Sequence, residues 1–138
     1  MNKHVALNVT LLIYRSGISL MMMTHGFSKL TRLLEGQVSF ADPLGFGQTA
    51  TLLLAILAEF IAPMLIILGW KTRYAAIPVV GVMSVAAFMV HAADPFAQKE
   101  LALLYLLAFL MVVFVGPGKY SLDKKQKYPN QFRERKYI

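Results

Sequence analysis

Four long apolar stretches occupy most of the 138-residue chain, and they constrain its fold more than any other feature. They cover about 7–30, 49–70, 74–91 and 98–115, and the last reaches this length only if Gln98 to Glu100 form its first turn. A helix of roughly 20 apolar residues spans a bilayer core about 30 Å thick. We therefore expect an all-α integral membrane protein, built as one four-helix bundle.

The composition agrees with a membrane location. Hydrophobic residues make up 57% of the chain and charged residues 15%. A typical soluble domain has about 45–50% apolar residues and about 25% charged residues. The chain has no cysteine, which excludes disulfides, cysteine nucleophiles and iron–sulfur ligation on this polypeptide. Any redox chemistry would therefore need a bound cofactor or a partner protein.

The connections between the stretches differ in length. Gly69 to Arg73 forms a tight turn between the second and third stretches, and Asp94 to Phe96 separates the third from the fourth. The connection from Thr31 to Gln48 is long, and the sequence leaves open whether it is an exposed loop or a partly embedded re-entrant segment. Arg15 interrupts the first stretch, so we expect this helix to remain as an anchor rather than be cleaved as a signal peptide.

Lysine and arginine predict the orientation. Ten of the fourteen fall on the side that holds both termini and the 71–73 turn, and three fall on the other side. Cytoplasmic segments carry the excess of basic residues. We therefore expect both the N and C termini in the cytoplasm, and residues 119–138 to form a basic cytoplasmic tail.

The net charge of +7 also requires nucleic-acid binding to be considered. Aromatic residues alternate with basic ones in the tail, as in some nucleic-acid-binding surfaces. Because the rest of the chain lies in the membrane, contact with anionic lipid explains this tail better. We expect the lipid bilayer as a partner and no nucleic acid.

Ionisable groups inside or beside the apolar stretches are the candidate functional residues, because such groups are costly at bilayer depth. Helical rise places four near the outer side of the membrane and one near its centre. Imidazole and carboxyl groups there could exchange protons with a ligand, and the ammonium group could donate hydrogen bonds to it. The five candidates for ligand or quinone binding and proton handling are His25, Lys29, Glu59, His91 and Glu100.

Each candidate also has a structural interpretation. Arg15 and Glu59 could form a buried ion pair that only fixes helix packing. Lys29 could extend towards the headgroups. Tyr105, close to Glu100 on the fourth stretch, could supply a hydroxyl group, although such a tyrosine is more often a core residue.

Haem or a metal ion is a weaker alternative. His25 and His91 could be axial haem ligands, or could join Glu59 and Glu100 around a metal. The sequence contains no closely spaced ligand motif, so we expect no dedicated metal site.

The sequence resembles the DoxX family of small four-span bacterial membrane proteins, which is related to the small subunits of thiosulfate:quinone oxidoreductase. The segments that carry the likeness are Arg15 with HGFSKL at 25–30, Ala58-Glu59 with LGWKTR at 68–73, His91 with Pro95-Phe96, and ELALLY at 100–105 with GPGKYSLD at 116–123. One departure is that Phe60 to Pro63 stand where many members have small glycines after the Ala-Glu pair.

This resemblance implies a bundle in the bacterial inner membrane with a loose association with redox processes. The first hypothesis is a quinone-linked component that works with a partner oxidoreductase. The second is a non-enzymatic accessory or assembly subunit of a larger membrane complex. A transport role would require a homo-oligomer, since a single four-helix chain hardly encloses a path.

Overall fold

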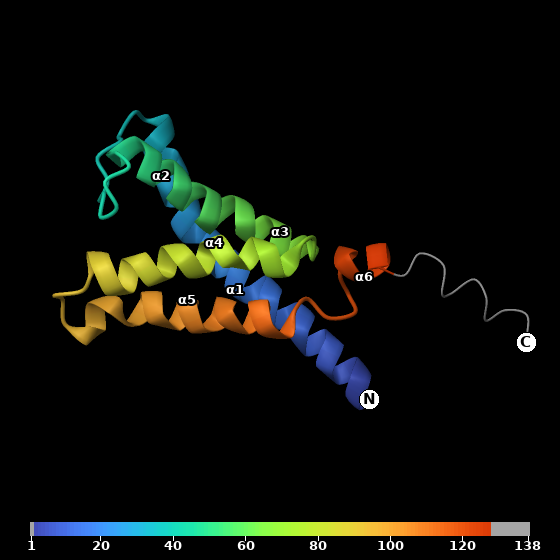
Figure 1. The fold of residues 1–138 in the computed structure, drawn as a ribbon. Coiled ribbons are helices and arrows are strands. Elements are labelled where there is room, and N and C mark those ends of the chain that lie inside the picture. Colours follow the sequence, from blue (N-terminus) through green and yellow to red (C-terminus); the bar gives the residue numbers. More distant parts are fainter. Residues whose placement is uncertain (1, 128–138) are drawn as a thin grey trace, which may run out of the picture.

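The structure of the chain, a computed structural model, describes residues 2–127, with side chains as far as Lys124. All regular secondary structure in this part of the chain is helical. Four segments are long and apolar enough to cross a membrane: Lys3–Leu34, Gln48–Leu68, Thr72–Val90 and Phe96–Val115. The predicted all-α bundle of four spans is therefore confirmed, and Figure 1 shows its course.

The spans differ in their regularity. The first and fourth are single helices, α1 (Lys3–Leu34) and α5 (Phe96–Val115). The second consists of α2 (Gln48–Ile56), the π-helical turn η1 (Leu57–Ile61) and α3 (Ala62–Leu68). The third consists of α4 (Thr72–Val85) and the π-helical turn η2 (Ala86–Val90), and the short α6 (Leu122–Lys127) follows α5. Residues 98–100 thus belong to the fourth helix, as its length required.

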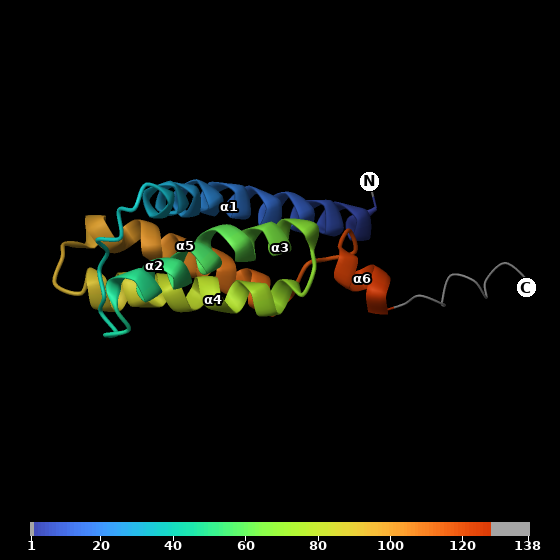
Figure 2. The same cartoon turned by 90° about the horizontal axis from the view of Figure 1, so that it is seen from above.

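The two ends of the bundle differ in what they contain (Figures 1 and 2). The loop end holds the connection between α1 and α2 and the turn between α4 and α5. The tail end holds the N-terminus, the turn between α3 and α4, and α6. Between the two ends, α4 packs along α5, while α1 crosses them at an angle and packs mainly on η1 and α3. The fully buried core side chains include Met22, Ile66, Val79 and Phe109.

The π-helical turn η1 places Glu59 within the second span. Proline has no N–H group, so Pro63 cannot donate the ordinary helical hydrogen bond to the carbonyl oxygen of Glu59. The ladder widens here, and the backbone N–H of Ala62 donates to the carbonyl oxygen of Leu57, five residues back. Such widened turns occur often at functional sites. Pro63, four residues after Glu59, therefore reshapes the backbone that carries Glu59.

Gly26 lets α1 approach η1 at backbone distance. A Cβ atom added to Gly26 would lie 2.5 Å from the carbonyl carbon of Glu59 and 2.7 Å from the backbone nitrogen of Phe60. Both are backbone atoms and cannot swing aside as the end of a side chain could. This contact fixes the position of Glu59 relative to α1.

The first part of the predicted tail packs against the bundle. The backbone N–H of Lys119 donates to Asn8 Oδ1 at 2.7 Å. The carboxylate of Asp123 accepts hydrogen bonds from the backbone N–H groups of Lys71 and Thr72, at 2.6 and 2.9 Å, and from the Thr72 hydroxyl at 2.8 Å. Asp123 thereby caps the first turn of α4. The expectations for residues 128–138 lie outside the described residues.

The pKa of Asp123 follows from these contacts. Burial alone would raise its pKa, but the hydrogen bonds from Thr72 and Lys71 and the nearby charge of Arg15 outweigh this effect and lower the pKa. Asp123 is therefore held as a carboxylate where it caps α4.

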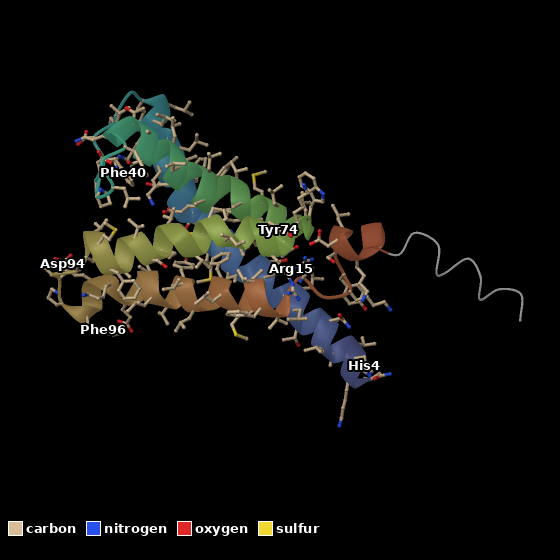
Figure 3. The ribbon with its side chains drawn as sticks, viewed as in Figure 1. His4, Arg15, Phe40, Tyr74, Asp94 and Phe96 are labelled. Carbon is tan, nitrogen blue, oxygen red and sulfur yellow. The ribbon has the colours of Figure 1, made fainter. Side chains whose placement is uncertain are left out.

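Arg15 does not pair with Glu59, and that prediction was wrong. Arg15 is 2% exposed, and its Nη2 donates to the carbonyl oxygen of Tyr120 at 2.5 Å. Gly26, which contacts Glu59, lies eleven residues further along α1, or about 16 Å at helical rise. The charged groups of Arg15 and Glu59 therefore lie at different depths in the bundle. Figure 3 shows Arg15 beside the segment that leads into α6.

We expect the Gly26→Ala substitution to lower the free energy of unfolding by about 1–3 kcal/mol, because the added methyl group forces α1 away from η1. Thermal unfolding in detergent measures this loss. Gly17→Ala is the matched control on the same helix, since a Cβ there would meet no atom within 4 Å. It should leave the stability unchanged or raise it by up to about 1 kcal/mol. Equal effects of the two substitutions would contradict the close approach at Gly26.

Candidate functional site

Lys29 and Glu59 form an ion pair that joins α1 to η1. The Glu59 side chain is 3% exposed and the Lys29 side chain 23%. Burying two charges is costly, and their attraction compensates only when both partners are present. Lys29 lies one turn after Gly26, on the same face of α1, so the close backbone contact brings it to Glu59. The sequence indicated both residues as candidates but did not predict that they pair.

Two cavities at the loop end share this ion pair in their walls. The smaller has a volume of about 170 Å³ and the larger about 570 Å³. Both are lined by Lys29, Glu59, Ala86 and His91. Ala86 and His91 lie at the two ends of the π-helical turn η2, where the His91 N–H donates to the Ala86 carbonyl oxygen at 3.0 Å. The π-helical turns η1 and η2 therefore both contribute to the walls of these two cavities.

The smaller cavity gathers polar groups from α1 and α5. His25 meets the Tyr105 ring edge to face, with the ring centroids 5.7 Å apart. Tyr105 is 9% exposed, and its hydroxyl makes no hydrogen bond to another described residue. This hydroxyl is therefore available to a molecule in the cavity, whose apolar walls include Met22 and Leu101.

His91 is held at the rim by Asp94. Its Nδ1 lies 2.6 Å from Asp94 Oδ2, and both side chains are just over one third exposed. Asp94 lies in the turn between α4 and α5 at the loop end (Figure 3). Because Nδ1 is engaged, Nε2 is the ring nitrogen of His91 that remains for a ligand or a proton.

The larger cavity is mostly apolar and is covered by the connection between α1 and α2. Phe40, Pro43, Leu44 and Phe46 of this connection face residues of α2 and α4 across the cavity. Figure 3 shows Phe40 in this connection, and its ring lies 5.8 Å from Lys29 Nζ. The connection is thus part of the site. Its first predicted residues, 31–34, belong to α1, and residues 35–47 are not helical.

Asp42 organises this connection. Oδ1 accepts hydrogen bonds from the Thr51 hydroxyl at 2.9 Å and the Phe46 N–H at 3.0 Å, and Oδ2 accepts one from the Gly47 N–H at 2.9 Å. The bond from Thr51 is the largest influence on Asp42 and, with the backbone bonds, lowers its pKa. Asp42 therefore ties the covering segment to the first turn of α2.

The predicted candidates fall into two groups. His25, Lys29, Glu59 and His91 line the same small cavity. Glu100 is exposed and lies outside the linings of both cavities, whereas its neighbour Leu101 faces the smaller one. Glu100 is thus one helical position away from the site.

The metal alternative finds no ligand set within the described residues. No group of three His, Cys, Asp or Glu there is arranged to hold a metal ion. His25 and His91 do line one cavity, but its volume of about 170 Å³ is below the usual range of ligand pockets.

Sequence reasoning missed the covering segment and its anchor. An aspartate shortly before a helix is a recognisable signal, because its carboxylate can accept several backbone N–H groups in a turn. The signal was present in Asp42 and Gly47. Nothing in the pattern, however, indicated that Phe40 would return to Lys29.

These features define an integral membrane protein of four spans with a partly buried ion pair between two cavities. A model of the DoxX family matches residues 10–92. The match includes Arg15, His25, Lys29, Glu59 and His91. The chain belongs to the DoxX family, as the sequence resemblance predicted.

Curated relatives of similar length agree with this assignment. An uncharacterized protein of Haemophilus influenzae is 37% identical over 115 residues, which cover 78% of this chain and 84% of the relative. The inner membrane protein YqjF of Escherichia coli is 28% identical over 123 residues, covering 85% and 92%. No solved structure matches the chain.

Asp42→Ala should loosen the segment that covers the larger cavity, because three hydrogen bonds lose their acceptor. We expect faster amide hydrogen exchange at Phe46 and Gly47, with exchange in α4 and α5 unchanged. Glu35→Ala is the control in the same connection, since Glu35 accepts only a 3.3 Å bond from the Gln37 side chain. Unchanged exchange in the Asp42 variant would show that Asp42 does not hold the segment.

Proposed function

We propose that this protein binds a quinone-type ligand at the loop end and serves as a quinone-linked membrane component of a partner oxidoreductase. The observation that carries the proposal is the shared wall of the two cavities. A cavity richer in polar groups and a mostly apolar cavity meet there at Lys29, Glu59 and His91. A ligand with a polar ring and an apolar body requires such an arrangement.

The available groups fit the carbonyl oxygens of a quinone. The Tyr105 hydroxyl has no partner among the described residues and can donate a hydrogen bond. The Lys29 ammonium group carries three N–H donors, and its bond to Glu59 leaves two of them. The larger cavity, about 570 Å³, lies within the usual size range of ligand sites. It would hold the apolar part under Phe40 and Leu44.

A bound quinone would carry electrons and protons between the membrane and the partner. The residues of this chain would bind and orient it and hold protons near it. The Lys29 ammonium group would attract a carbonyl oxygen of the quinone, and the Glu59 carboxylate would balance the positive charge of Lys29. His91, held by Asp94 close to the outside of the bundle, would be the group that exchanges protons with the solution.

In this proposal a partner protein carries out the electron transfer itself. The chain contains no cysteine that could serve as a redox centre. Its relative YqjF is described as an inner membrane protein, which supports placement of this chain in the bacterial inner membrane. The distribution of basic residues supports cytoplasmic N and C termini, so the quinone site would face the outer side.

The test is binding of a short-chain ubiquinone analogue to the purified full-length protein in lipid nanodiscs. One hydrogen bond contributes about 1 kcal/mol to the free energy of ligand binding. We therefore expect His91→Ala and Tyr105→Phe each to weaken binding of the analogue roughly 5-fold. His4→Ala is the control, because His4 lies at the tail end of α1 (Figure 3). It should bind the analogue like the wild type.

Two outcomes would contradict the proposal. One is binding no stronger than to empty nanodiscs. The other is equal binding by the wild type and by both site variants, provided that thermal unfolding shows each variant to be folded. If the chain then copurifies from mild detergent with a stable partner but binds no quinone, the accessory-subunit hypothesis replaces the quinone site.

A further inference from the structure

The tail end of the bundle holds a third cavity, on the far side of the molecule from the site above. Its volume is about 660 Å³. It lies between the start of α4, the end of α5, the connection to α6, and α1 at Asn8. We call it the tail-end cavity. Its size is within the usual range of ligand sites.

The lining of this cavity is strongly cationic. Lys71, Arg73, Lys119 and Lys124 line it, against one acid, Asp123. Asp123 already accepts three hydrogen bonds as the cap of α4, and the charge of Arg15 acts on it as well. Its carboxylate carries one negative charge against four positive side chains, so the lining remains cationic.

Different segments bring these cations together. Arg73 crosses the end of α5, where its Nε would lie 2.9 Å from a Cβ added to Gly116. Its Nη2 is 3.4 Å from the Val115 carbonyl oxygen, which is a long hydrogen bond. Lys119 is held in place through its backbone bond to Asn8. Neither Arg73 nor Lys119 has an ion-pair partner among the described residues.

Like charges repel, so a hollow with several cations is stabilised by an anion. A guanidinium group with free N–H donors and neighbouring ammonium groups is suited to phosphate oxygens. We propose that the tail-end cavity binds the phosphate group of an anionic phospholipid.

The position of the cavity favours a lipid over a soluble phosphate. Tyr74, on the cavity wall, is 75% exposed, and Phe114, beside the lining residue Val115, is 71% exposed. Tyr74 lies towards the tail end in Figure 3. Tyrosine and tryptophan gather at the headgroup level of membranes, and Trp70 precedes the turn here. A headgroup in the cavity would thus have apolar surface beside it for its acyl chains.

The test compares full-length protein in nanodiscs of phosphatidylcholine, with and without phosphatidylglycerol. Lipid binding is followed by native mass spectrometry and thermal unfolding. Each basic residue near a membrane surface contributes about 1 kcal/mol, so Arg73→Gln with Lys119→Gln should weaken phosphatidylglycerol binding roughly 30-fold. Arg73→Lys with Lys119→Arg should restore most of it. Unfolding in phosphatidylcholine alone checks that each variant is folded.

Lys3→Gln with Lys99→Gln is the matched control, because it removes two charges outside the cavity lining. This variant should retain wild-type binding. Equal weakening of both double variants would show diffuse attraction to surface charge and would overturn the proposal, as would undiminished binding by the cavity variant. Inorganic phosphate is the second probe. Should it bind as tightly as the lipid and be lost in the cavity variant, the phosphate site stands, but its lipid occupant is overturned.

Discussion

The Lys29–Glu59 ion pair is the interaction on which the loop-end site depends. Two charges in an apolar bundle are tolerated only as partners, and their pairing requires α1 and η1 to meet closely. Gly26 permits that contact, and Pro63 contributes to the widened turn that carries Glu59. The pair then forms the wall shared by two cavities of different polarity. The local sequence, the helix packing and the proposed ligand chemistry therefore converge on one contact.

The two ends of the bundle divide the remaining polar groups. The loop end gathers imidazole, phenol, carboxylate and ammonium groups around two open cavities. The tail end gathers cations around Asp123, whose carboxylate joins the first turn of α6 to the first turn of α4. Arg15 belongs to this second group through its bond to Tyr120. An apolar layer that includes Met22, Ile66 and Val79 lies within the core of the bundle.

The hydrophobic pattern predicted the four spans because a helix that crosses the bilayer needs about twenty apolar residues in a row. Ionisable residues are rare within these spans, and this rarity indicated His25, Lys29, Glu59 and His91 as candidates. All four line the same cavity. The ion-pair partner of Glu59 could not be obtained this way, since it depends on the backbone contact at Gly26. Nor could depth alone separate Glu100 from Leu101, because only the rotation of α5 decides which of them lines the smaller cavity. The cap formed by Asp123 depends on a contact across about fifty residues, which no local pattern contains.

The ion pair couples Lys29 and Glu59 energetically across the interface between α1 and η1. A double-mutant cycle measures this coupling directly, with Lys29→Met, Glu59→Gln and the double variant unfolded reversibly in detergent. We predict that each single variant is less stable than the wild type, and that the double variant loses about 1–3 kcal/mol less than the two single losses together. Losses that add to within about 0.5 kcal/mol would show that the two residues act independently, and would contradict this coupling.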